Sequence, residues 1–245
     1  MEVIKVEGIV VGETNYSESS KILRVLTDDY GIISVMSKGC RNLKSKLRGV
    51  SAIFSYGFFH IYYKSTGIST LVGVDTLNSF SKIMMDIDKI SYATYILDLV
   101  EQVAKHSDTN GYFRILIDTL IKINDGYDYT ILTNIFELKM LDFLGIRPVI
   151  DSCSICGSKN KIVTIDPTAG GYICQDCYRN EKIYSDKTIK LIRMFYYVDI
   201  SKVTKLEIHD DVKKEINEFI DLYYDRYSGL YLKSKSFLKN LSKIK

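Results

Sequence analysis

The sequence lacks the features of a membrane or secreted protein. Within its 245 residues, no apolar run approaches the roughly 20 residues that a membrane span requires. The first segment carries Glu2, Lys5, Glu7 and Glu13, and a secretory leader does not place acids in its apolar core. We therefore expect a cytoplasmic protein with no membrane partner. Its 46% apolar and 26% charged residues are typical of one large or two to three small globular domains.

Motifs of the common enzyme classes are also missing. There is no Walker loop, nucleophile elbow, His-Glu metal motif or dinucleotide fingerprint. The three histidines, His60, His106 and His209, are isolated in the sequence, and we interpret them as structural. Tryptophan is absent and only two prolines occur, but neither fact excludes a function. The sequence favours a binding protein over an enzyme.

Acidic residues are missing from two stretches of the chain. None occurs from Tyr30 to Val74 or after Asp225. The first stretch contains Lys38, Arg41, Lys44, Lys46, Arg48 and Lys64, and the second contains Arg226, Lys233, Lys235, Lys239, Lys243 and Lys245. These are 12 of the 33 basic residues, so the rest of the chain carries a net charge of −9. The protein therefore has two basic regions and an acidic middle.

The first 78 residues predict a small β domain. Short segments rich in β-branched and aromatic residues are separated by turn residues. They are residues 3–11, 21–26, 31–36, 52–63 and 69–74. Five such strands fit the OB-fold, a five-stranded barrel that binds nucleic acid strands. An SH3-like barrel would give much the same pattern.

Beyond Leu77 the apolar residues follow the spacing of helices. We predict a helical domain in two parts, residues 79–149 and 181–245. The first part contains helices at 87–105, 111–123 and 128–144, and the last of these ends where Gly145 and Pro148 prevent its continuation. The second part begins a helix at Ser185 and another near Asp210, and it ends in a basic tail. The predicted fold class is a multidomain α+β protein.

Four of the five cysteines form the most specific motif in the chain. Cys153, Cys156, Cys174 and Cys177 have the spacing C-x₂-C-x₁₇-C-x₂-C, which is typical of a structural zinc ribbon. Four thiolates fill the coordination shell of one Zn²⁺ and leave no position for a reacting water. We predict that residues 150–180 form an inserted ribbon with one structural zinc per chain. Ordinary reduced cysteines or a redox dithiol are the alternatives, and Cys40 is interpreted as a small residue of the basic region.

The segment 37–49 combines positive charge with hydroxyls, amides and glycine, the groups that bind phosphate oxygens. Aromatic side chains on the neighbouring strand, Tyr56, Phe58, His60 and Tyr62, could stack on bases if they are exposed. We predict DNA-binding roles for Lys38, Arg41, Lys44, Lys46, Arg48, Lys64, Lys233 and Lys235. A solvated loop and a frayed basic tail are the alternatives, although a merely solvated surface usually mixes both signs of charge.

Short pieces of the sequence, taken in order, resemble the RecO recombination mediators of bacteria. They are residues 16–22, Leu26-Thr27 ahead of Gly31, residues 37–41, residues 136–148, the cysteine motif with Gly170-Gly171, and residues 232–238. Each piece is short, but together they span essentially the whole chain. Where the family often has Ala-Arg after Ser-Lys-Gly, this chain has Cys40-Arg41, which leaves the positive charges in place.

The resemblance implies an N-terminal OB-fold, a helical domain and an inserted zinc ribbon. It also implies a nucleoid-associated repair protein that binds single- and double-stranded DNA and anneals complementary strands. With RecR, such a protein helps RecA to replace single-strand-binding protein, and some members bind the tail of that protein. Some members lack the cysteines, which fits a structural metal. The alternative is a zinc-ribbon adaptor that contacts only proteins, in which the acidic helical middle carries the function.

Overall fold

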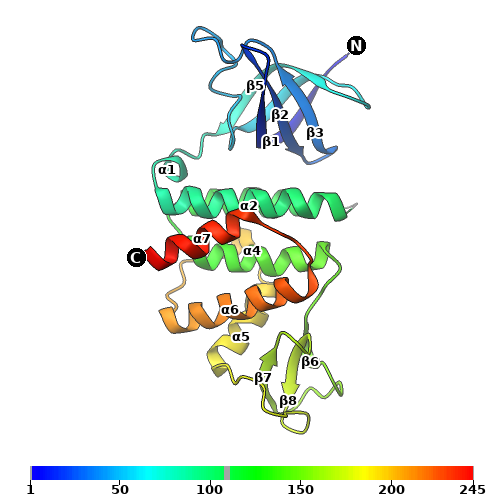
Figure 1. The fold of residues 1–245 in the computed structure, drawn as a ribbon, viewed down its shortest axis with the longest axis vertical. Helices are drawn as coiled ribbons and strands as arrows, with labels where there is room; N and C mark the ends of the chain where they lie inside the picture. The colour runs from blue at the N-terminus through cyan, green and yellow to red at the C-terminus, as the bar shows by residue number, and fades with distance from the viewer. Residues whose placement is uncertain (1, 108–110, 245) are drawn as a thin grey trace. The chain divides into compact units, whose positions relative to one another are not determined.

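Five strands form a closed barrel in the first part of the chain. The computed structural model describes residues 2–107 and 111–244, with side chains through Leu238. The strands are β1 (Val3–Tyr16), β2 (Ser20–Thr27), β3 (Gly31–Ser37), β4 (Tyr56–Tyr62) and β5 (Ser69–Asn78). Figure 1 draws these strands in blue to cyan. Their order around the barrel is β1-β2-β3-β5-β4, and only the β3–β5 pair is parallel. This is the strand order of an OB-fold and not of an SH3-like barrel.

The alternation of apolar residues along the strands produces the barrel core. On β4, Phe59 and Ile61 point inward and are fully buried. Phe58 and His60, which alternate with them along the strand, are only half-buried. Gly57 lies so close to β5 that a Cβ atom there would sit 2.2 Å from the carbonyl oxygen of Asp75. Only glycine permits this approach of two backbones. The core contains Val6, Val10, Leu23, Val25, Val35, Phe59, Ile61 and Leu71.

Three helices follow the barrel within the first compact unit, Met1–Asn124. They are α1 (Ser81–Met84), α2 (Ile87–His106) and α3 (Tyr112–Asn124). Helix α2 begins after Asp86, whose carboxylate accepts hydrogen bonds from the backbone N–H groups of Asp88 and Lys89 at 3.0 and 3.1 Å. Such a side-chain cap satisfies donors that have no partner within the helix.

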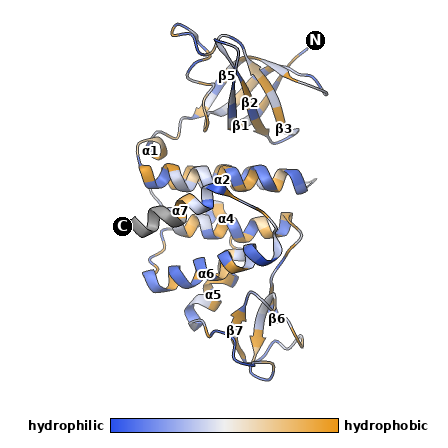
Figure 2. Cartoon of the chain, in the orientation of Figure 1, coloured by the Kyte–Doolittle hydropathy of each residue, from blue (hydrophilic) through white to orange (hydrophobic). Residues whose placement is uncertain are grey.

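The second compact unit, Asp125–Lys245, combines helices with a small sheet. The helices are α4 (Tyr129–Phe143), α5 (Asp186–Tyr197), a 3₁₀ turn (Ile200–Lys202), α6 (Asp210–Tyr227) and α7 (Lys233–Ile244). The strands β6 (Val149–Cys153), β7 (Ile162–Asp166) and β8 (Gly171–Cys174) form a sheet in the order β6-β8-β7. Helix α4 packs against α5 and α6. Polar and apolar residues alternate along α6 in Figure 2, and its buried face contains Ile216, Phe219, Ile220, Tyr223 and Tyr224.

The predicted α+β class is confirmed, and the differences from the predicted elements are local. Strand β1 continues to Tyr16, five residues beyond its predicted end, because it keeps pairing with β2 after a register shift between Val10 and Gly12. The predicted basic tail forms helix α7. The predicted domain boundaries at residues 78, 149 and 180 are finer than the division into two units and stay predictions. None of the helices within residues 2–107 and 111–244 combines the length and apolarity of a membrane span.

Candidate functional site

Five of the six predicted cations of the barrel lie together on one connection. Residues 38–55, which we call the basic loop, join β3 to β4. Five exposed side chains on this loop are positively charged: Lys38, Arg41, Lys44, Lys46 and Arg48. Within the part of the chain whose side chains are described, none of the five forms an ion pair with a carboxylate. The loop therefore presents uncompensated positive charge to solvent.

Successive tight turns give the basic loop its shape. The N–H groups of Asn42, Ser45 and Arg48 donate to the carbonyl oxygens of Gly39, Asn42 and Ser45 at 3.1, 3.1 and 3.2 Å. Gly39 adopts φ = +65°, which an L side chain rarely permits. Leu47 packs against the barrel core. Because this apolar side chain points inward, the charged residues on either side of it face outward.

Hydrogen bonds fix the basic loop to the barrel at several points. The hydroxyls of Ser37 and Ser51 lie 2.7 Å apart and are buried. The backbone N–H of Arg41 donates to the carbonyl of Ser19 at 2.8 Å. At the end of the loop, the N–H of Phe54 donates to the β1 backbone at 3.0 Å. The loop is thus attached near its start and at its end.

Two acidic side chains of the barrel bind a cation of helix α3 in this unit. Glu7 of β1 and Asp28 after β2 both bind Arg114 of α3, each at 2.8 Å. Hydrogen bonding to Glu7, more than that to Asp28, keeps the pKa of Arg114 above its ordinary value. Arg24 of β2 pairs with Glu101 of α2 at 2.5 Å. These carboxylates stabilise the contact of the barrel with α2 and α3 and do not offset the basic loop.

The predicted aromatic row on β4 is only partly available. Tyr56 is buried: it stacks on Phe80 with ring centroids 5.9 Å apart, and its hydroxyl donates to Glu7 at 2.6 Å. Phe58 lies under the Lys5 amine, which is 4.6 Å from its ring centroid. Tyr62 is 41% exposed. Burial removes Tyr56 from the set of residues that could stack on a base.

His60 lies on the outer face of β4, and Lys64 follows this strand. His60 is 2.9 Å from Asp75, and this contact, followed by that of Lys5, keeps the pKa of the Asp75 carboxyl below its ordinary value. Lys64 is exposed in the β4–β5 connection. Asp75 thus places one acid on this surface, whereas none lies between Tyr30 and Val74.

The two predicted cations of α7 occupy different environments. Lys233 is exposed. The amine of Lys235 lies 2.9 Å from Glu137 and 2.6 Å from Asp221, and only 16% of its side chain is exposed. Its charge is compensated inside the fold, so we leave Lys235 out of the nucleic-acid interface. The side chains of Lys239, Lys243 and Lys245 lie outside the described residues.

The four predicted cysteine ligands meet at one point. The sulfur atoms of Cys153, Cys156, Cys174 and Cys177 all lie within 4.8 Å of one another, and those of Cys156 and Cys174 are 3.6 Å apart. A tetrahedral ion bound by sulfurs at about 2.3 Å would place them about 3.8 Å apart. The cluster therefore has the size that a metal ion requires.

Tight turns present both cysteine pairs. The N–H of Gly157 donates to the carbonyl of Cys153 at 2.9 Å, and the N–H of Cys177 donates to that of Cys174 at 3.1 Å. Gly157 has φ = +75°, a conformation that favours glycine. Each turn brings two sulfurs to the same side of the backbone. Sequence spacing alone was sufficient to find this site.

The pKa values of Cys153 and Cys177 in the cluster depart from the ordinary value in opposite directions. Burial raises the pKa of Cys153, but backbone N–H groups, first that of Cys156, outweigh it and lower this pKa to about 6. The pKa of Cys177 is raised to about 12, chiefly through its hydrogen bond with Cys156. One thiolate therefore forms readily, while the neighbouring sulfurs oppose ionisation of Cys156 and Cys177. A cation among the sulfurs would remove this repulsion, so the donor set fits a metal ion.

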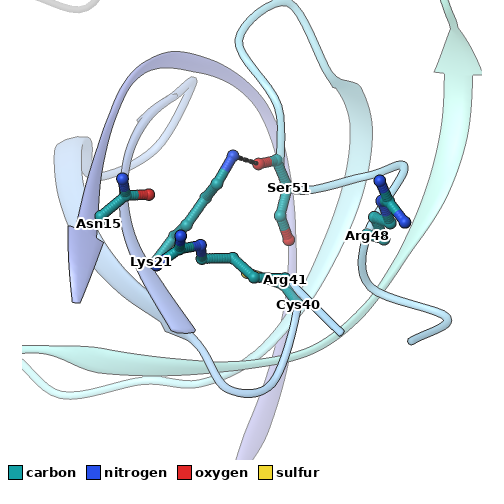
Figure 3. A pocket seen from close by; sticks show the side chains of 6 residues that line it. All are labelled: Asn15, Lys21, Cys40, Arg41, Arg48 and Ser51. Atoms are coloured by element: carbon teal, nitrogen blue, oxygen red, sulfur yellow. Dashed lines mark hydrogen bonds between the residues drawn. The ribbon is translucent and has the colours of Figure 1, made fainter. Parts of the chain in front are cut away.

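The sequence did not identify Asn15 and Lys21 as members of a binding surface. Both line a hollow of about 320 Å³ together with residues of the basic loop (Figure 3). Both residues lie near the β1–β2 turn. The sequence does not show that the basic loop lies beside them in the fold. A signal in the sequence was the basic Lys21 at the start of a strand, directly ahead of the apolar Ile22 and Leu23.

Comparison with known proteins gives a consistent result over the whole chain. The family model "Recombination protein O N terminal" matches residues 1–80, and "Recombination protein O C terminal" matches residues 84–236. The chain is 36% identical to a DNA repair protein RecO of Listeria monocytogenes serotype 4b over 243 residues, which cover 98% of this chain and 95% of that protein. A protein of the same name from Bacillus pumilus is 36% identical over 246 residues, with 99% and 96% coverage.

Proposed function

Because this chain belongs to the RecO family of DNA repair proteins, we propose that it binds single- and double-stranded DNA and anneals complementary strands. The basic loop is the principal contact, with Lys64 and Lys233 as further contacts. The observation that carries the proposal is the set of five exposed cations on this loop that no carboxylate of the described residues offsets.

The chemistry of the loop explains both binding and annealing. Lysine and arginine side chains replace the counterions of phosphates, and the released ions favour binding with little dependence on base sequence. Two complementary strands repel one another through the same phosphates. A loop that neutralises several of them lets the bases of both strands approach. Base pairing then supplies the sequence specificity that the protein does not need to provide.

We propose that the metal of the cysteine cluster is a single structural Zn²⁺. Four sulfur donors in tight turns suit zinc, and such a set leaves no open position for substrate. Zinc would contribute to the folding of a module whose three strands are only four or five residues long. No step of DNA binding requires contact with the ion.

The family assignment also suggests the biological setting. We propose that the protein acts with RecR in recombinational repair, where it assists RecA in replacing single-strand-binding protein on DNA. The partners are DNA, RecR and single-strand-binding protein, and RecA indirectly. The site of action is the chromosome in the cytoplasm. In this role the protein brings macromolecules together, and we assign no bond-breaking activity to it.

The decisive experiment compares two variants with the same change in net charge. In the loop variant, Ala replaces Lys38, Arg41, Lys44, Lys46 and Arg48. In the control variant, Ala replaces five exposed lysines of the second unit, Lys159, Lys187, Lys190, Lys205 and Lys214. Fluorescence anisotropy measures oligonucleotide binding, and the rate of duplex formation measures annealing. We expect both activities to fall in the loop variant and to persist in the control.

A protein-only adaptor is the alternative function. If the wild-type chain does not retain a single-stranded oligonucleotide in 50 mM salt, the adaptor interpretation replaces ours. Equal losses in the loop and control variants would show that net charge, and not the basic loop, controls binding.

A further inference from the structure

A hollow lies between the basic loop and the first two strands of the barrel. It has a volume of about 320 Å³ and is lined by Asn15, Lys21, Cys40, Arg41, Arg48 and Ser51 (Figure 3). This volume is at the lower end of the range of about 300–1,000 Å³ found for small-molecule sites. The hollow is therefore large enough for one nucleotide-sized group and too small for a stretch of duplex.

The lining of this hollow is strongly basic. It contains one lysine and two arginines, and no carboxylate. The Lys21 amine lies 2.7 Å from Glu13, which offsets its charge, and donates to the Ser51 carbonyl at 3.4 Å (Figure 3). Arg41 and Arg48 have no ion-pair partner among the side chains that are described. About two positive charges thus remain uncompensated at the hollow.

Hydrogen-bond donors approach the hollow from several elements. The amide of Asn15 comes from β1, and Lys21 comes from β2. Arg41 and Arg48 come from the two halves of the basic loop, and in Figure 3 Arg48 stands apart from the other cations. One N–H of Arg41 donates to the carbonyl of Ser17 at 3.2 Å. This bond orients the guanidinium while its other N–H groups remain for a ligand.

The walls of the hollow are fixed in place before a ligand arrives. Cys40 is only 2% exposed, and the hydroxyl of Ser20 accepts from the N–H of Gly39 at 3.1 Å. Ser51 is anchored by its buried hydroxyl contact with Ser37 at 2.7 Å. A preformed site loses little conformational entropy on binding. These contacts distinguish the hollow from a set of long cationic side chains on a flexible loop.

We propose that this hollow binds a phosphate monoester, the terminal phosphate of a DNA strand. A phosphate inside a strand is a diester with one negative charge, whereas a monoester carries about 1.5 to 2 negative charges at pH 7. The two uncompensated cations match the monoester. Arginine is also suited to phosphate because its planar group forms paired hydrogen bonds with two oxygens. This inference rests on the proposed DNA binding, and it adds recognition of phosphorylated strand ends.

The test compares oligonucleotides that differ only at their ends. Each has the same sequence of 20 nucleotides and an internal fluorophore, with a 5′-phosphate, a 3′-phosphate or hydroxyls at both ends. We expect the wild-type protein to bind one phosphorylated form about tenfold more tightly than the hydroxyl form. The preferred end identifies which phosphate enters the hollow. Millimolar inorganic phosphate should reduce this preference with little effect on the hydroxyl form.

Two double variants separate the hollow from the rest of the loop. Arg41→Ala with Arg48→Ala removes the cations of the hollow, and Lys44→Ala with Lys46→Ala removes two exposed cations outside it. Both should weaken general binding. Only the first should reduce the ratio between phosphorylated and hydroxyl ends to about one. Thermal unfolding checks that both variants remain folded, as we expect for exposed side chains.

Three outcomes distinguish the inference from the proposed function. Equal binding of all ends by the wild-type protein overturns the inference and leaves DNA binding in place. Retention of the preference in the arginine double variant also overturns it. If no oligonucleotide binds, the proposed function fails, and the melting temperature in inorganic phosphate then tests the hollow. If inorganic phosphate raises the melting temperature of the wild type but not that of the arginine double variant, the phosphate site is supported. If it does not raise the melting temperature of the wild type, the phosphate site is refuted.

Discussion

The amine of Lys235 lies 2.9 Å from the carboxylate of Glu137, and both side chains are largely buried. Asp221 contacts the same amine at 2.6 Å. Glu137 belongs to α4, Asp221 to α6 and Lys235 to α7, so one cation connects three helices. Burial lowers the pKa of Lys235, but the charges of Glu137 and Asp221 outweigh this effect and hold the pKa above its ordinary value. The lysine therefore stays protonated and fixes α7 to the second unit.

Replacing Lys235 with Ala should destabilise the second unit by about 3 kcal/mol, because it leaves two carboxylates near a buried site without their cation. Lys233→Ala, an exposed change on the same helix, should cost less than about 0.5 kcal/mol. Urea unfolding followed by the fluorescence of the 19 tyrosines measures both. Equal effects of the two substitutions would mean that the buried ion pairs do not hold α7.

The contribution of Lys235 also has a predictable pH dependence. A group whose pKa is raised on folding stabilises the fold at pH values below its unfolded pKa, which is about 10.4 for lysine. This stability is lost as the pH rises through the folded value. The difference in unfolding free energy between wild type and Lys235→Ala should therefore be constant near pH 8 and shrink only above about pH 10.5.

The case of Lys235 shows what sequence patterns can and cannot predict. The cysteine spacing identified the sulfur cluster because two short turns largely determine the ligand positions. The alternation of apolar and polar residues along the strands identified the barrel, because it too depends only on residues that are close together in the sequence. Counting charges in the sequence did not distinguish the buried Lys235 from the exposed Lys233. The partners of Lys235, Glu137 and Asp221, lie 98 and 14 residues away in sequence. Contacts between distant segments also buried Tyr56 and created the hollow beside Lys21.

Elemental analysis should find about one zinc per chain. We expect Cys153→Ser and Cys177→Ser to lose the metal, because each removes one of four ligands from the shell. Cys40→Ala is the matched control, since Cys40 lies outside the cluster and should leave the metal content unchanged. Strong chelators should also destabilise the wild-type protein. A fully folded, metal-free wild-type protein would contradict the assignment.

Glu215 stabilises the start of α5 in a pH-dependent way. Its carboxylate accepts hydrogen bonds from the hydroxyls of Ser185 and Thr188 and from the Ser185 N–H at 3.2 Å. Burial raises the pKa of Glu215, but these hydrogen bonds outweigh it and place the pKa below its ordinary value. Stability from a lowered pKa is present above the unfolded pKa, about 4.3 for glutamate, and is lost as the pH falls through the folded value.

Glu215→Gln should therefore lower the unfolding free energy by about 1 kcal/mol at pH 7, a value reduced by the partial exposure of this group. The difference from wild type should shrink as the pH falls below about 4.3 and the native carboxylate takes up its proton. Glu207→Gln, an exposed change in the same unit, should have little effect at either pH. A pH-independent loss in Glu215→Gln would assign the effect to packing and not to charge.

The salt dependence of DNA binding can identify which lysines contact phosphates. For single strands, the logarithm of affinity falls with the logarithm of salt concentration by about 0.7 for each phosphate contact. Lys44→Ala and Lys46→Ala should each reduce this slope by about 0.7, and the five-residue loop variant by about 3.5, if all five cations contact phosphates. Lys235→Ala should leave the slope unchanged, because its charge is already paired with Glu137 and Asp221. If replacing a lysine or arginine lowers affinity but leaves the slope unchanged, that residue acts on the fold. Only ion release at a phosphate alters the number of counterions exchanged.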